Sequence, residues 1–119
     1  GTGLTLSGST NVLLSYLNIN SNSIMNCGVN HQAGGVNVLG GENIILSWNN
    51  ITGNCEAGIN TDINGITLNN NYICNNSPTD NLLCPFASPK TFLGINNQVS
   101  IGGSNWRCEI SQLINTMSC

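Results

Sequence analysis

The chain has 119 residues, with five acidic and two basic residues and a formal net charge of −3 at pH 7. This length predicts a single domain, 1–119, and the scarcity of basic residues argues against nucleic acid as a partner. No apolar run approaches the roughly 20 residues of a membrane span.

A pattern of aliphatic and polar residues occurs three times, at 11–22, 43–54 and 65–76. The copies align without gaps, so aliphatic residues recur at shared positions: Val12, Ile44 and Ile66; Leu14, Leu46 and Leu68; Ile19, Ile51 and Ile73. Two aliphatic residues spaced by two indicate a strand with one buried face. Because no copy can bury its own apolar row, the copies are predicted to stack, with strands about 4.8 Å apart.

Each copy follows a shorter strand that begins with glycine, at 3–6, 35–38 and 58–61. The step from Val36 to Ile59 is 23 residues, whereas the step from Leu4 to Val36 is 32. The extra residues are predicted near 23–34, because turns tolerate insertions and stacked strands do not.

The period breaks at 77–91, where three prolines predict a loop. Strands at 92–95 and 99–101 are expected to form a last, irregular coil. The tail is predicted to form a short helix, about 109–117, that caps the C-terminal end. Its apolar residues fall at i, i+3, i+4 and i+7, on one helical stripe: Ile110, Leu113, Ile114 and Met117.

The repeats, with Ile, Val and Leu inside and Asn at the turns, resemble the right-handed parallel β-helix proteins over roughly 3–76 and 92–101. The resemblance implies an all-β fold, a short right-handed parallel β-helix (a β-solenoid) of about four coils. It implies no single function, because the class includes polysaccharide lyases, glycoside hydrolases, epimerases, adhesins and fibre proteins.

Six cysteines in so short a chain indicate an oxidising compartment, and hence a secreted or cell-surface protein. The predicted disulfides are Cys27–Cys55, Cys74–Cys84 and Cys108–Cys119. Metal binding is the rival interpretation, but the closely spaced cysteine pairs of zinc sites are missing, and no cofactor is indicated. Two sequons predict glycosylation, at Asn50 and Asn75.

Candidate catalytic groups are few. Glu42 and Asp62 lie in corresponding turns of neighbouring coils and could form the carboxylate pair of a glycosidase, or they are solvated turn residues. His31 lies in the inserted stretch with no obvious partner. Lyases of the β-helix class use a basic residue beside calcium-binding acids, whereas Lys90 and Arg107 fall outside the regular coils. No catalytic residue is therefore assigned.

Tyr16 and Trp48 occupy the same repeat position. They could form a sugar-binding platform, contact a glycan on Asn50 or a neighbouring subunit, or simply stack on each other. Leu17, Asn49 and Asn71 also align, and asparagines in register can hydrogen-bond along a stack.

The sequence favours a non-catalytic secreted structural protein, a subunit of an extracellular fibre or surface assembly. A homo-oligomer is expected, in which the end at 1–6 docks on the C-terminal region of another copy, and such head-to-tail contacts build filaments. The alternatives are a carbohydrate-active enzyme, or a fragment of one, and a glycan-binding module.

Overall fold

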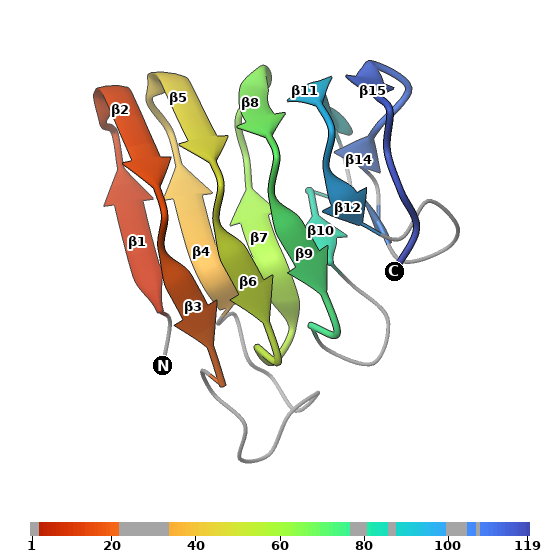
Figure 1. The fold of residues 1–119 in the computed structure, drawn as a ribbon. Helices are drawn as coiled ribbons and strands as arrows, with labels where there is room; N and C mark the ends of the chain where they lie inside the picture. Colours follow the sequence, from red (N-terminus) through yellow and green to blue (C-terminus); the bar gives the residue numbers. More distant parts are fainter. Residues whose placement is uncertain (1–2, 22–33, 77–80, 86–87, 100–104, 107) are drawn as a thin grey trace.

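The computed structural model describes residues 3–21, 34–76, 81–85, 88–99, 105–106 and 108–119. Within these residues the protein is all-β, and its strands pair in parallel in three sheets. The chain passes through the three sheets in turn and then repeats the passage one layer further along (Figure 1). This arrangement is compatible with a solenoid of the β-helix type.

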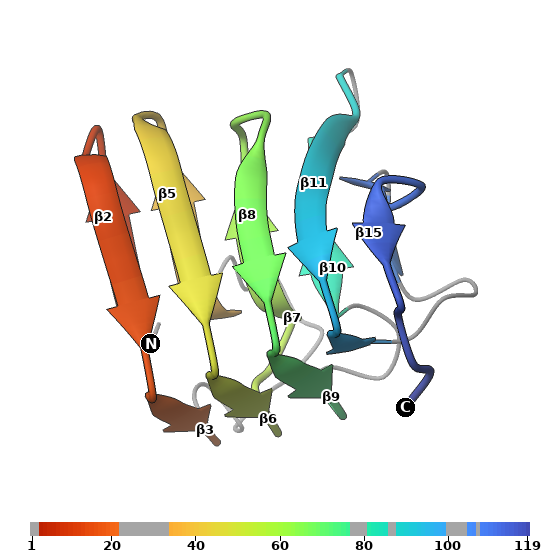
Figure 2. The same cartoon turned by 45° about the horizontal axis from the view of Figure 1, so that its top comes forward.

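The strands of each sheet follow the order of these passages. The first sheet contains β1 (Leu4–Ser7), β4 (Gly34–Leu39), β7 (Ala57–Thr61), β10 (Leu82–Leu83) and β13 (Asn105–Trp106). The second contains β2 (Thr10–Ser15), β5 (Glu42–Ser47), β8 (Ile66–Asn69), β11 (Lys90–Ile95) and β14 (Cys108–Glu109), and β15 (Leu113–Ile114) also pairs with β11. The third contains β3 (Asn18–Asn20), β6 (Asn50–Thr52), β9 (Tyr72–Cys74) and β12 (Gln98–Val99). Figure 2 shows the second sheet in front of the first, with the third below it.

The aliphatic columns predicted from the repeats are confirmed by the strand register. Val12 pairs with Ile44, Leu14 with Leu46 and then Leu68, and Ile19 with Ile51 and then Ile73. In the inner layers these side chains are almost fully buried. The core therefore runs along the stack, between the sheets.

Gly35 and Gly58, the second residues of β4 and β7, lie where no side chain fits. A Cβ on Gly35 would come within 2.8 Å of both Ile51 Cγ2 and Asn54 Nδ2. A Cβ on Gly58 would meet Ile73 Cγ2 at 2.7 Å and Asn76 Nδ2 at 2.8 Å. Glycine at these positions allows the first sheet to approach the third.

Buried asparagines form the predicted ladder at the turn between the second and third sheets. Asn71 Oδ1 accepts hydrogen bonds from the backbone N–H of Asn49 (2.9 Å) and from Asn49 Nδ2 (3.1 Å). Asn97 Oδ1 does the same for Asn71, at 2.9 and 3.1 Å. Each amide nitrogen also donates to a carbonyl of the preceding layer, as Asn71 Nδ2 does to Leu46 O at 2.8 Å.

A second buried ladder lies where the third sheet ends, and the sequence analysis did not predict it. Asn76 Oδ1 accepts from Asn54 N and Asn54 Nδ2, at 3.1 and 2.8 Å. Asn81 Oδ1 then accepts from Asn76 Nδ2 at 3.1 Å. The same geometry therefore satisfies buried backbone groups at two of the turns.

The predicted C-terminal helix is wrong. Instead of a helix, residues 108–119 contain β14 and β15 and a parallel bridge between Gln98 and Met117. Ile114 and Met117 are 60% and 64% exposed, so they form no buried stripe with Leu113. Pairing with β11 and with Gln98 satisfies the backbone of this tail, which continues the stack as a further layer.

Two of the predicted disulfides are also wrong. The structure contains Cys74–Cys119 and Cys84–Cys108, which link residues 45 and 24 positions apart and tie the last layers together. Cys84 follows β10, a short strand inside the loop predicted for 77–91. Cys55 is also disulfide-bonded, but Cys27, its predicted partner, lies outside the described residues. Disulfides fit an oxidising environment.

The ladder predicts that replacing a buried asparagine destabilises the protein much more than replacing an exposed one. We expect Asn71→Ala to lower the free energy of unfolding by about 2–4 kcal/mol, because it leaves the buried Asn49 N–H without its acceptor and removes a hydrogen bond to the Leu46 carbonyl. Asn50→Ala, in an exposed position one layer away, should cost less than about 1 kcal/mol. Urea unfolding measures both, and similar losses would contradict the role of the ladder.

Candidate functional site

Among the residues that the structure describes, the candidate catalytic residues do not come together in one site. Asp62 Oδ1 accepts a hydrogen bond from the backbone N–H of Gly40 at 2.8 Å, which joins the turns of neighbouring layers. Glu42 is exposed at the start of β5, and Lys90 Nζ donates to Ser88 Oγ at 3.1 Å. His31 and Arg107 lie outside the described residues. Among the residues described, no three His, Cys, Asp or Glu side chains gather in a way that could hold a metal ion.

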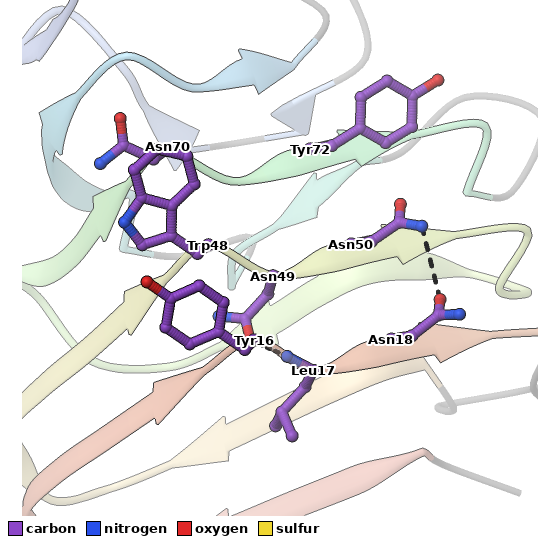
Figure 3. Close-up of a pocket in the computed structure, with 8 residues that line it drawn as sticks. All are labelled: Tyr16, Leu17, Asn18, Trp48, Asn49, Asn50, Asn70 and Tyr72. Atoms are coloured by element: carbon purple, nitrogen blue, oxygen red, sulfur yellow. Dashed lines mark hydrogen bonds between the residues drawn. The ribbon is translucent and has the colours of Figure 1, made fainter.

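Tyr16 and Trp48 come together as their shared repeat position predicts. Ser15 pairs with Ser47, so the next residue in each layer turns outward at the same level. The ring planes are parallel within 2°, with centroids 6.4 Å apart. The two rings are therefore stacked with an offset, and Figure 3 shows both of them face-on. Because Tyr16 is 79% and Trp48 55% exposed, most of this aromatic surface faces solvent.

The backbone at these two residues is left-handed. Tyr16 has φ 57° and Trp48 has φ 58°. In the later layers, asparagine occupies the equivalent turn position: Asn70, Asn96 and Asn115, with φ between 55° and 60°. Asparagine tolerates this conformation, whereas a bulky side chain raises its free energy by roughly 1–2 kcal/mol. The first two layers therefore carry aromatic rings where the fold itself favours asparagine.

A surface hollow of about 410 Å³ adjoins the aromatic pair. Its lining residues come from the turn and from the outward side of the third sheet: Tyr16, Leu17, Asn18, Trp48, Asn49, Asn50, Asn70 and Tyr72. Tyr72 was not singled out from the sequence. The repeat contains a signal that could have identified it. Asn18, Asn50 and Tyr72 occupy the same repeat position, so the third copy has an aromatic residue where the first two have asparagine.

Among the residues that the structure describes, no acidic or basic residue lines the hollow. Its polar groups are amides, the phenols of Tyr16 and Tyr72 and the indole N–H of Trp48, and its apolar groups are ring faces and the side chain of Leu17. Such a surface can pack against flat apolar groups and exchange hydrogen bonds with neutral ones, but it cannot neutralise a charge.

The two sequons are placed differently. Asn50 is exposed and lies beside the hollow, within β6. Asn75 is exposed in a turn with φ 58°, and Ser77, which completes its sequon, lies outside the described residues. Glycosylation of either residue stays a prediction.

The left-handed turn predicts an order of stability among variants of Trp48. Trp48→Asn and Trp48→Ala both remove the ring, but only asparagine tolerates the backbone conformation. We expect Trp48→Asn to be about 1 kcal/mol more stable than Trp48→Ala. Thermal and urea unfolding measure this difference, and equal stabilities would show that the turn imposes no such preference.

No helix among the described residues is long and apolar enough to cross a membrane. No family model, curated protein or solved structure matches the chain. Any functional assignment therefore rests on two features of the molecule itself, the aromatic hollow and the ends of the stacked sheets.

Proposed function

We propose that the chain is a right-handed parallel β-helix that serves as a non-catalytic structural module in a secreted assembly. The repeated passage through three parallel sheets supports the β-helix form. The disulfides Cys74–Cys119 and Cys84–Cys108 support an oxidising, extracellular setting.

One observation carries the structural role: no described strand pairs with the outer edge of β1, β2 and β3. These strands are outermost in all three sheets. Their core-facing side chains are only partly buried, including Leu6, Val12, Leu14 and Ile19. The residues paired with them in the next layer are at most 1% exposed: Val38, Ile44, Leu46 and Ile51. A further layer of strands on this edge would bury the apolar columns completely.

The edge also lacks the devices that usually prevent strand pairing. Natural edge strands carry charged residues or proline, or are very short. β1, β2 and β3 contain neither a charged residue nor a proline, and β2 has six residues. This edge is therefore suited to pairing with another chain.

The opposite end is less suited to pairing. Its described strands β13, β14 and β15 have two residues each, and β14 contains the exposed acid Glu109. The disulfide between Cys74 and Cys119 anchors the tail across this end. Short strands and a charge are typical of a blunted edge.

The asparagine ladder also disfavours head-to-tail stacking. At the first layer the ladder position is Leu17, whose backbone N–H donates to Asn49 Oδ1 at 3.0 Å. If a parallel layer were added before the first one, its backbone N–H at this position would find no side-chain oxygen at Leu17 to accept a hydrogen bond. Thr116 occupies the same position in the last layer, since Met117 pairs with Gln98, and it too lacks an amide. We therefore favour a second copy as partner, with two N-terminal edges facing each other in a closed dimer.

The test is the oligomeric state of edge variants. We expect a dimer by light scattering after size exclusion, and a monomer for Val12→Lys, because an inward-facing lysine blocks edge pairing. Leu13→Lys is the matched control, because Leu13 is 62% exposed on the outward side of the same strand and should leave the dimer intact. Circular dichroism establishes that both variants fold.

Each result has a distinct meaning for the proposal. Filaments that Val12→Lys abolishes would show assembly through this edge, in the head-to-tail arrangement expected from the sequence. A wild-type protein that stays monomeric at millimolar concentration would overturn the proposed assembly.

A further inference from the structure

We propose that the aromatic hollow binds a neutral saccharide, which stacks on Tyr16 and Trp48. Tyr16, Leu17 and Asn18 belong to the same layer as the proposed assembly edge, but the hollow lies on the outward side of that layer. The inference rests on the arrangement of the rings, the polar groups beside them and the backbone conformation that holds them.

The two rings form a surface that suits the apolar face of a sugar ring. Their planes differ by 2° and their centroids lie 6.4 Å apart in an offset stack, and both rings are seen face-on in Figure 3. A pyranose presents C–H groups on its faces and hydroxyl groups around its rim. Ring faces accept the C–H groups, as aromatic side chains do in binding sites that are mainly apolar with a few polar groups.

The polar groups of the hollow suit the rim of the same ligand. Asn18 Oδ1 accepts hydrogen bonds from Asn20 Nδ2 at 3.0 Å and from Asn50 Nδ2 at 3.4 Å. Among the described residues, Asn18 Nδ2 and Asn50 Oδ1 have no protein partner, and both side chains are exposed. One can donate to a hydroxyl group and the other can accept from one.

The described lining residues carry no charge, and this determines which class of saccharide the hollow can bind. An acidic sugar would bring a carboxylate or sulfate into a hollow whose described lining residues include no lysine or arginine. Sites for such anions use charged, often bidentate, donors. A neutral hexose or N-acetylhexosamine unit needs only ring faces and amides.

Stability alone does not explain the two aromatic residues. The left-handed turn is satisfied by asparagine in the later layers, at Asn70, Asn96 and Asn115. Tyr16 and Trp48 adopt the same φ with bulky side chains and remain 79% and 55% exposed. Strained residues of this kind cluster at ligand sites.

Two sources could supply the same sugar chemistry. Asn50 begins a sequon and lies in the hollow, so a glycan attached there would start beside the rings. A free neutral oligosaccharide would reach the same surface from solution. The experiment therefore needs one arm for each source.

The first arm uses the Thr52→Ala protein, which cannot carry a glycan on Asn50 because its sequon is broken, and which keeps the Asn50 side chain in the hollow. Neutral oligosaccharides of glucose, mannose, xylose and N-acetylglucosamine are titrated in by NMR, with oligogalacturonate as the charged comparison. We expect saturable shifts at Tyr16, Trp48 and Tyr72 with a neutral ligand only. Tyr16→Asn or Trp48→Asn, made in the same background, should weaken binding by about tenfold or more, the equivalent of about 1.4 kcal/mol.

Asparagine is chosen for these variants because the turn accepts it, so loss of binding cannot be attributed to unfolding. Leu13→Asn is the matched control, because it removes an exposed apolar side chain that does not line the hollow, and it should bind as before. Val12→Lys should also bind as before, which separates this site from the assembly edge.

The second arm uses the glycosylated protein and looks for nuclear Overhauser contacts between the glycan on Asn50 and the two rings. Such contacts without binding of free sugar would identify the attached glycan as the occupant. The proposal is overturned if neither arm shows contact with the rings, or if Tyr16→Asn and Trp48→Asn bind sugar unchanged. A change in oligomeric state in these two variants, without sugar binding, would overturn it in favour of a protein partner.

Discussion

The stacking of parallel strands in register is the constraint on which the rest of the structure depends. Within each sheet, a residue lies directly over its repeat partner, so aliphatic side chains form continuous columns such as Leu14, Leu46 and Leu68. The same register brings asparagines over one another. Their amides then hydrogen-bond to backbone groups at the turns and in the strands before them, as Asn71 does with the Asn49 N–H and the Leu46 carbonyl. Apolar and polar residues thus require the same spacing, and a slip of one residue would break both.

This construction explains why the two ends of the molecule differ. Every inner layer has neighbours on both sides, whereas a terminal layer has one. Toward the C-terminal end the described strands are short, and the Cys74–Cys119 disulfide links the tail to β9. At the N-terminal edge the strands are uncharged, and Val12 and Leu14 of the six-residue β2 are only half-buried. The proposed self-association follows from this asymmetry.

The aromatic hollow shows how a repeat can carry a local specialisation. The turn position needs a residue that tolerates a positive φ, and the later layers use asparagine there. Replacing it with Tyr16 and Trp48 in two adjacent layers stacks two rings on the surface without altering the strands. The third sheet adds Tyr72 and the amides of Asn18 and Asn50. A binding surface can therefore arise from a few substitutions on an otherwise regular scaffold.

The sequence by itself determined the features that obey the repeat. It predicted the parallel all-β layers, the columns of Val, Ile and Leu, the ladder through Asn49 and Asn71, and the shared level of Tyr16 and Trp48. The sequence did not predict contacts between residues that are far apart in the chain and lie outside the repeat. Asn81 follows Asn76 by five residues yet occupies the next rung of the second ladder. The tail resembled a helix because its apolar spacing matched one, and only pairing with β11 made it extended. Cys74 was paired with a near neighbour in sequence, whereas the stacking of the layers places it next to Cys119. Local pattern specifies what each layer looks like, but contacts between irregular segments depend on where the chain lies in space, which only the tertiary structure decides.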